Sequence, residues 1–200
     1  MRYVAIDVET TGLGEKCGLL ELAMVAEDTT QPFAVEDLPY FRALFWPADA
    51  VWEPFAMNMH RKNGLLDEVL SGERRDGEYA WGVLRCWLRG NDTHGPYGDV
   101  ESVPLHAPLL SIPGTEPQLP KIVAAGKNFA GFDRRFIGPI AKHFDYRAID
   151  PGSVFIHWRE DRLPGMGDLL KSVTGSAVEV KHRALDDARD VVRVLRRAYR

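Results

Sequence analysis

Short runs of apolar and β-branched residues, broken by polar turns, dominate the first quarter of the chain. The runs cover residues 3–6, 18–26 and 40–46, and Pro47 closes the third. Runs of this length that are bounded by turn residues are typical of buried strands. The acidic and Pro-containing segments between them favour antiparallel pairing. The pattern therefore predicts three strands before the first helix.

Helical spacing begins near residue 76, where Asp76 or Gly77 is a suitable cap and Gly90 a suitable end. The large apolar residues of this segment share one stripe of a helix: Trp81, Leu84, Trp87 and Leu88. Farther along, the pattern predicts strands over 121–125 and 146–149 and helices over 131–144, 168–173 and 183–199, the first of these interrupted near Pro139.

Strands first and alternation afterwards predict the α/β class, with a mixed sheet flanked by helices. Residues 91–120 interrupt this order because they are rich in Pro and Gly and keep neither a strand nor a helix period. Such a segment is longer than most structureless connections. We expect residues 1–200 to form a single domain, with residues 91–120 as an insertion or loop.

The composition is that of an ordinary globular domain, with 45% hydrophobic residues, a net charge of −4 and two cysteines. No apolar run has the length of a membrane-spanning helix, and acids stand where a signal peptide needs an apolar stretch. We therefore expect a cytoplasmic protein without a membrane partner.

Charge is distributed unevenly along the chain. Residues 1–120 hold 9 basic and 19 acidic side chains, whereas residues 121–200 hold 16 and 10. A basic half is able to attract a polyanion and gathered acids are able to hold a cation, but a solvated surface explains the same imbalance.

The first candidate chemistry lies at the end of the first predicted strand. Asp7 and Glu9 are two residues apart, so a strand sends both side chains to one face. Carboxylates that close repel each other, and a divalent cation relieves the repulsion by accepting oxygen ligands from both. A strand that simply runs into a polar turn at residues 10–12 is the alternative interpretation of the pair.

Three further residues belong to later segments. Asp133 follows the strand predicted over 121–125 and lies near the start of a helix, a place that the helix dipole favours for an acid. His182 and Asp187 bracket the start of the last predicted helix, where Asp187 shares a stripe with Val191 and points toward the sheet.

These motifs resemble those of the DEDDh group of 3′-to-5′ exonucleases. The matching segments are AIDVETTGL with Asp7 and Glu9, NFAGFDRRFI with Asp133, and HRALDDARD with His182 and Asp187. The resemblance implies an RNase H-like fold and these five residues as the catalytic set, with the four acids as metal ligands. It spans nearly the whole chain apart from residues 91–120.

Within that group the chain is most similar to oligoribonucleases. The similarity rests on the segment FAMNMH followed by Gly64-Leu65, and on the forms FDRRFI and HRALDD. It implies that Leu13 and Phe55 wedge the terminal bases and that Tyr146 and Arg147 contact the substrate, with Arg147 at the 5′ phosphate. Further residues with an implied substrate role are Thr10 and His60, and a structural histidine is the alternative interpretation of His60. The chain departs from these relatives by Thr10 in place of Met and by the extra segment 91–120.

The chemistry agrees with this resemblance. Two divalent cations stabilise charge on both the attacking and the leaving oxygen of a phosphodiester, and carboxylate ligands suit Mg²⁺ or Mn²⁺. An imidazole titrates near neutral pH, so His182 is suited to accept a proton from the attacking water. The expected product is a nucleoside 5′-monophosphate.

Three functions stay open on sequence alone. The first is hydrolysis of short single-stranded RNA, the second is general 3′-end hydrolysis of RNA or DNA, and the third is non-catalytic nucleic-acid binding. The third is disfavoured because four carboxylates repel a phosphate backbone unless they hold metal. The oligoribonuclease resemblance also implies a homodimer as one state.

Overall fold

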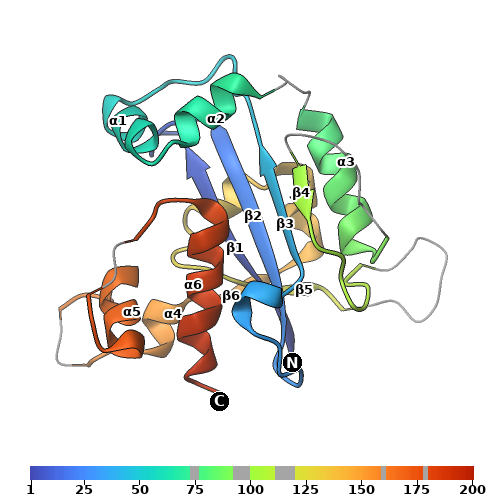
Figure 1. Ribbon diagram of the computed structural model, residues 1–200, viewed down its shortest axis with the longest axis vertical. Helices are drawn as coiled ribbons and strands as arrows, with labels where there is room; N and C mark the ends of the chain where they lie inside the picture. Colours follow the sequence, from blue (N-terminus) through green and yellow to red (C-terminus); the bar gives the residue numbers. More distant parts are fainter. Residues whose placement is uncertain (73–76, 92–99, 111–119, 159–160, 178–179) are drawn as a thin grey trace.

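The computed structural model describes residues 1–72, 77–91, 100–110, 120–158, 161–177 and 180–200. In these residues the strands form a six-stranded sheet of order β4-β3-β2-β1-β5-β6 (Figure 1). The strands are β1 (Arg2–Thr10), β2 (Leu19–Asp28), β3 (Tyr40–Leu44), β4 (Val100–Ser102), β5 (Ile122–Ala125) and β6 (Phe144–Ile149). Strands β1 to β4 pair antiparallel, whereas β5 runs parallel to β1, and β6 parallel to β5. The α/β class with a mixed sheet is thereby confirmed.

The helices connect and cover these strands. The α-helices are α1 (Pro54–Lys62), α2 (Leu65–Ser71), α3 (Gly77–Leu88), α4 (Pro151–Val154), α5 (Met166–Thr174) and α6 (Ala184–Arg196). The 3₁₀ helices are η1 (Val35–Asp37), η2 (Asp133–Arg135) and η3 (Gly138–His143). Among the described residues, none of the helices combines the length and apolar character needed to cross a membrane.

Alternation along β1 divides the core into two layers. Tyr3 and Ala5 pack in a core shared with α6, which lies across one face of the sheet (Figure 1). Val4 and Ile6 pack on the other face, in a core shared with α3 and with the apolar residues around η3. Because side chains alternate along a strand, the odd positions at the carboxyl end of β1 continue the row that faces α6. This register fixes which face carries Asp7 and Glu9.

The helix predicted over residues 131–144 is wrong. The structure has the two short 3₁₀ helices η2 and η3 there instead. Gly138, the first residue of η3, has φ of 48° in the left-handed region, and Pro139 has no N–H to donate. An α-helix cannot continue through these two residues, although the segment still covers the sheet.

Three α-helices have no counterpart in the sequence prediction. Helix α1 begins with Pro54 at its first position, and α2 follows Gly64, whose φ is 79°. Both helices are short, and α1 buries only Ala56 and His60, so its apolar stripe is too weak to read. Helix α4 is a single turn capped by Asp150, whose carboxylate accepts hydrogen bonds from the backbone of Gly152 and Ser153.

The segment predicted as a loop or insertion over 91–120 contains a strand. Strand β4 pairs with β3 and extends the sheet to its edge. The backbone N–H groups of Leu109 and Leu110 donate to the Leu88 carbonyl, which ties this segment to the end of α3. Residues 92–99 and 111–119 lie outside the described residues.

Candidate active site

Four carboxylates meet at the carboxyl end of β1. Asp7 and Glu9 come from β1, Asp133 begins η2 after β5, and Asp187 lies in the first turn of α6. Glu9, Asp133 and Asp187 are buried, at 6%, 4% and 8% exposure, and Asp7 is partly buried. We call these four residues the carboxylate cluster. The sequence predicted all four, and the fold brings them together from three separate segments.

The cluster is electrostatically unfavourable when its members are all charged. Burial raises the pKa of Asp7 well above its usual range, and repulsion from Asp133, Glu9 and Asp187 raises it further. Burial is also the main cause that raises the pKa of Glu9 to about 9, followed by repulsion from Asp187 and Glu21. Desolvated carboxylates at close range hold protons that exposed carboxylates release.

The other two acids show the same effect. Burial raises the pKa of Asp133 to about 7, although hydrogen bonds from its own backbone and that of Val8 oppose the rise. Burial and repulsion from Asp190 and Asp186 raise the pKa of Asp187 to about 7. A cation bound among these oxygens removes the repulsion that costs the folded protein stability.

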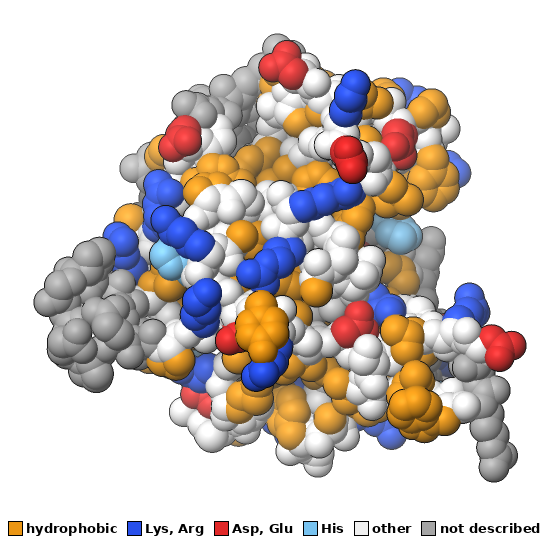
Figure 2. All heavy atoms as spheres, turned by 180° about the vertical axis from the view of Figure 1, so that it is seen from behind, with side chains coloured by type: hydrophobic (Ala, Val, Ile, Leu, Met, Phe, Trp, Pro, Cys, Tyr) orange, Lys and Arg blue, Asp and Glu red, His pale blue; other side chains and the backbone are white. Residues whose placement is uncertain are grey.

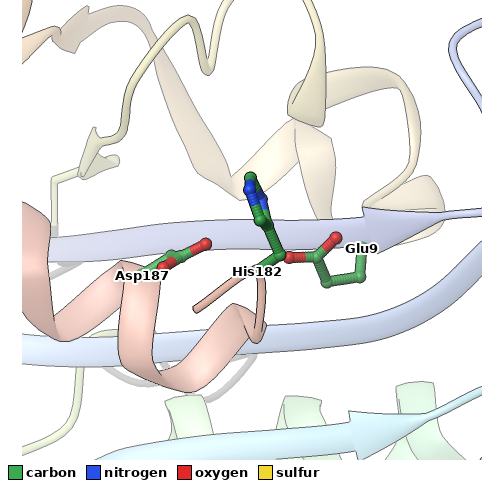
Figure 3. A group of neighbouring side chains, drawn as sticks. All are labelled: Glu9, His182 and Asp187. Carbon is green, nitrogen blue, oxygen red and sulfur yellow. The ribbon is translucent and has the colours of Figure 1, made fainter. Parts of the chain in front are cut away.

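Glu9, His182 and Asp187 form a group that fits a metal ion. One ligand atom from each lies within 4.8 Å of the others. In Figure 3 the Glu9 and Asp187 carboxylates flank the His182 side chain, which rises from the loop before α6. Asp187 Oδ1 is buried and accepts no hydrogen bond. An acceptor left unpaired in this way fits a bound cation, and carboxylate oxygens suit Mg²⁺ or Mn²⁺.

The loop that carries His182 has an unusual backbone held by specific contacts. His182 has φ of 52°, in the left-handed region that non-glycine residues rarely adopt. The Asn63 side-chain amide donates to the His182 carbonyl at 2.5 Å. Next in the chain, Arg183 donates to Glu68 at 2.5 Å. Asn63, between α1 and α2, and Glu68, in α2, thus fix the backbone at His182 and at the residue that follows it.

Glu21, on β2, also fixes the segment that carries His182. It is fully buried on β2 directly opposite Glu9, and it accepts a hydrogen bond from the Ala184 backbone at 2.9 Å. Arg42 Nε donates to its other oxygen at 2.5 Å. A buried charge requires such partners, and here the pairing anchors the start of α6 to the sheet.

Thr10 and His60 lie beneath the site surface. The Thr10 hydroxyl donates to the Gly12 carbonyl at 2.7 Å, and His60 Nε2 donates to the Thr10 carbonyl at 2.9 Å. His60 Nε2 also lies 3.8 Å from a Glu9 oxygen. Burial lowers the pKa of His60, whose exposure is 1%. Of the two interpretations of His60, substrate contact and a structural role, these hydrogen bonds and its burial favour a role in holding the end of β1.

Leu13 and Phe55 are exposed, at 71% and 77% of their surface, on two neighbouring segments. Glu53 joins their segments, since its carboxylate accepts hydrogen bonds from the Leu13 and Gly14 backbone at 3.1 and 3.2 Å. Arg135 Nη2 donates to the Leu13 carbonyl at 2.7 Å, which links the Leu13 loop to η2. The side chains of Leu13 and Phe55 are therefore exposed to solvent, while hydrogen bonds from Glu53 and Arg135 fix the backbone of the loop that carries Leu13.

Tyr146 and Arg147 lie on β6, at the edge of the sheet beyond β5. Both are exposed, and the Arg147 guanidinium carbon lies 4.8 Å from the centre of the Tyr146 ring. Stacked in this way, the pair presents an aromatic face and a cation to solvent.

Sequence reasoning missed the supporting residues Glu21, Glu53 and Asn63. Glu21 carries a signal, because it is the one acid within the apolar run of residues 18–26. Glu53 and Asn63 carry none, since their partners are backbone groups of distant loops.

Known proteins resemble this chain in fold. No family model and no curated protein matches the sequence. Matching solved structures include Pop2p from S. pombe in its Mg²⁺- and Mn²⁺-bound form, with 11% identity and a TM-score of 0.63 over 98% of this chain and 83% of Pop2p. E. coli Exonuclease I in complex with a dA16 oligonucleotide matches with 14% identity and a TM-score of 0.55, over 98% of this chain and 41% of that chain. The fold is therefore the RNase H-like mixed sheet flanked by helices that the sequence motifs imply.

Proposed function

We propose that this chain is a metal-dependent 3′-to-5′ exonuclease that hydrolyses short single-stranded RNA to nucleoside 5′-monophosphates. The observation that carries the proposal is the convergence of Asp7, Glu9, Asp133 and Asp187 beside His182. The ligands bound in two solved structures of this fold also support the proposal. Pop2p binds Mg²⁺ and Mn²⁺, and Exonuclease I binds an oligonucleotide.

In this proposal the carboxylate cluster holds two divalent cations, Mg²⁺ or Mn²⁺. The unpaired Asp187 Oδ1 and the raised carboxylate pKa values fit such ions. When bound there, such ions would supply a reactive hydroxide and would stabilise charge on the attacking and leaving oxygens.

His182 accepts the proton of the attacking water. Its side chain is exposed beside Glu9 and Asp187, where a water molecule and a scissile phosphate have access. The backbone contacts of Asn63 and Arg183 keep the imidazole aimed at this point. General base catalysis of this kind contributes roughly 10²- to 10⁴-fold in rate.

Four exposed side chains bind the substrate in this proposal. Leu13 and Phe55 stack against the bases at the 3′ end, because exposed apolar surface gains from covering a base. Tyr146 and Arg147 contact the strand from β6, where Arg147 pairs with the 5′ phosphate of a short substrate.

A time course of hydrolysis tests the function. The substrates are a 5′-labelled RNA dinucleotide, a longer single-stranded RNA and a single-stranded DNA, each with Mg²⁺, with Mn²⁺ and with EDTA. We expect fast, metal-dependent loss of the dinucleotide. DNA is included because Exonuclease I, of the same fold, is bound to dA16. A processive ladder on long RNA or DNA instead assigns general 3′-end trimming, and no hydrolysis of any substrate refutes the nuclease proposal.

Variants of the cluster test the site itself. Asp7→Ala and Asp187→Ala are expected to abolish hydrolysis while the circular dichroism spectrum stays native, because each removes a metal ligand. Full activity in either variant contradicts the assignment. We also propose the homodimer that the oligoribonuclease resemblance implies, and sedimentation equilibrium tests it against the chain mass of 22.5 kDa.

A further inference from the structure

A second charged group lies away from the carboxylate cluster, around His143. It consists of His143 and four cationic side chains, and we call it the basic surface: Arg85, Arg89, Lys121, Lys142 and His143. In the rear view, Lys and Arg side chains gather beside a histidine on the side of the molecule where α3 lies (Figure 2).

The fold brings these residues together from three segments. Lys142 and His143 end η3, immediately before β6. Lys121 immediately precedes β5, and the pairing of Ile122 with Phe144 places Lys121 next to His143 across the strands. The remaining two are Arg85, in the last turn of α3, and Arg89, which directly follows its last residue Leu88; α3 packs against η3.

The charges of the basic surface are not balanced within the described part of the chain. None of its four cations forms an ion pair with a described carboxylate, in contrast to Arg42, Arg183, Arg193 and Arg196. Burial lowers the pKa of His143, and Lys142, Arg89, Arg85 and Lys121 lower it further. Like charges gathered without a counterion attract anions from solution.

The basic surface is far from the carboxylate cluster along the strands. Val4 pairs with Ala124, so Lys121 is level with the first residue of the chain, six residues before Asp7. At about 3.3 Å per residue, the separation along the strands is roughly 20 Å. A dinucleotide bound at the cluster cannot reach this surface, whereas a longer strand can.

We propose that the basic surface binds backbone phosphates in the 5′ part of a single-stranded nucleic acid whose 3′ end lies at the carboxylate cluster. The inference rests on the proposed function for the direction of the strand. Charge complementarity favours a nucleic acid as the partner of the basic surface. The substrate of the proposed exonuclease is itself a row of phosphates, so one strand supplies both the 3′ end at the cluster and the negative charge at the basic surface. Strands long enough to span both places therefore bind more tightly than a dinucleotide.

The test measures binding with catalysis switched off. Fluorescence anisotropy in Mg²⁺ compares a labelled single strand of about ten nucleotides with a labelled dinucleotide, both built with hydrolysis-resistant phosphorothioate linkages. The variant is Lys121→Glu with Lys142→Glu, since both side chains are exposed. Arg162→Glu with Lys171→Glu, exposed near α5, is the matched control with the same change in charge.

We expect the wild type to bind the longer strand with a clear salt dependence, between about 50 and 200 mM salt. The Lys121/Lys142 variant loses about two phosphate contacts, so its slope of log K against log salt flattens by roughly 1.4 and its affinity at low salt falls about tenfold. Its dinucleotide binding and the control variant stay at wild-type values. A second variant, Lys121→Gln with Lys142→Gln, gives the same direction with a smaller loss.

Equal affinity and equal salt slope in wild type and variant overturn the proposal, as does a wild type that binds the longer strand no better than the dinucleotide. Failure of the nuclease function is a different result. If no substrate is hydrolysed but length-dependent binding is lost in the variant, the basic surface stands and the exonuclease does not.

Discussion

Replacing Asp187 by Asn is expected to stabilise the metal-free protein while abolishing hydrolysis. The side chain is 8% exposed, and burial together with neighbouring acids raises its pKa to about 7, from about 3.9 in an unfolded chain. Each pH unit of that difference corresponds to about 1.36 kcal/mol, so ionised Asp187 costs the fold roughly 4 kcal/mol at pH 8. Relaxation of the site reduces this to on the order of 1 to 4 kcal/mol.

The pH dependence of the free energy of unfolding tests the same effect of Asp187. An acid with a raised pKa in the folded state binds its proton more tightly when folded, so stability falls as pH rises from about 4 to about 7 and stays low above that. Asn does not titrate. The advantage of the Asp187→Asn variant should therefore be largest at pH 8 and shrink toward pH 5.

Urea denaturation in EDTA at several pH values measures this difference. Asp67→Asn makes the same chemical change at an exposed position of α2 and should leave the unfolding free energy within about 0.5 kcal/mol of the wild type. Added Mg²⁺ should stabilise the wild type more than Asp187→Asn, because the variant has lost a ligand oxygen. A variant that is no more stable than the wild type at pH 8 in EDTA refutes the account of repelling, desolvated carboxylates.

Two further predictions concern residues that support the site. Asn63→Ala should lower kcat about fivefold with little change in KM, because the His182 backbone loses one hydrogen bond. The control Asn58→Ala, at an exposed position of α1, should leave both constants unchanged. Steady-state kinetics on a dinucleotide measures both variants, and an equal loss of kcat in the two contradicts a positioning role for Asn63. Gly126→Ala should destabilise the fold by about 1 to 3 kcal/mol, because its Cβ would lie 2.7 Å from a backbone carbonyl oxygen of β1. Gly82→Ala in α3 meets no atom within 4 Å and should stabilise by up to about 1 kcal/mol, so thermal melts of the two variants should move in opposite directions.

Local patterns predicted the elements whose signal is carried by neighbouring residues. The period of 2 along β1 correctly placed Asp7 and Glu9 on one face, and the stripe of α6 correctly turned Asp187 toward the sheet. The same kind of reasoning failed over residues 131–144, where apolar residues suggested an α-helix. Gly138 and Pro139 decided the backbone there, and their effect outweighed the hydrophobic pattern.

The sequence by itself determined the α/β class, the order of the main strands and the residues of the carboxylate cluster, because each follows from short-range spacing or a local motif. Tertiary structure alone decided what surrounds the cluster. Glu21 lies opposite Glu9 only through the register of β1 and β2, and Asn63 reaches His182 across 119 positions of the chain. Contacts between distant segments leave no periodic trace in a single sequence, so the residues that shift the pKa values and hold the imidazole became visible only in the fold.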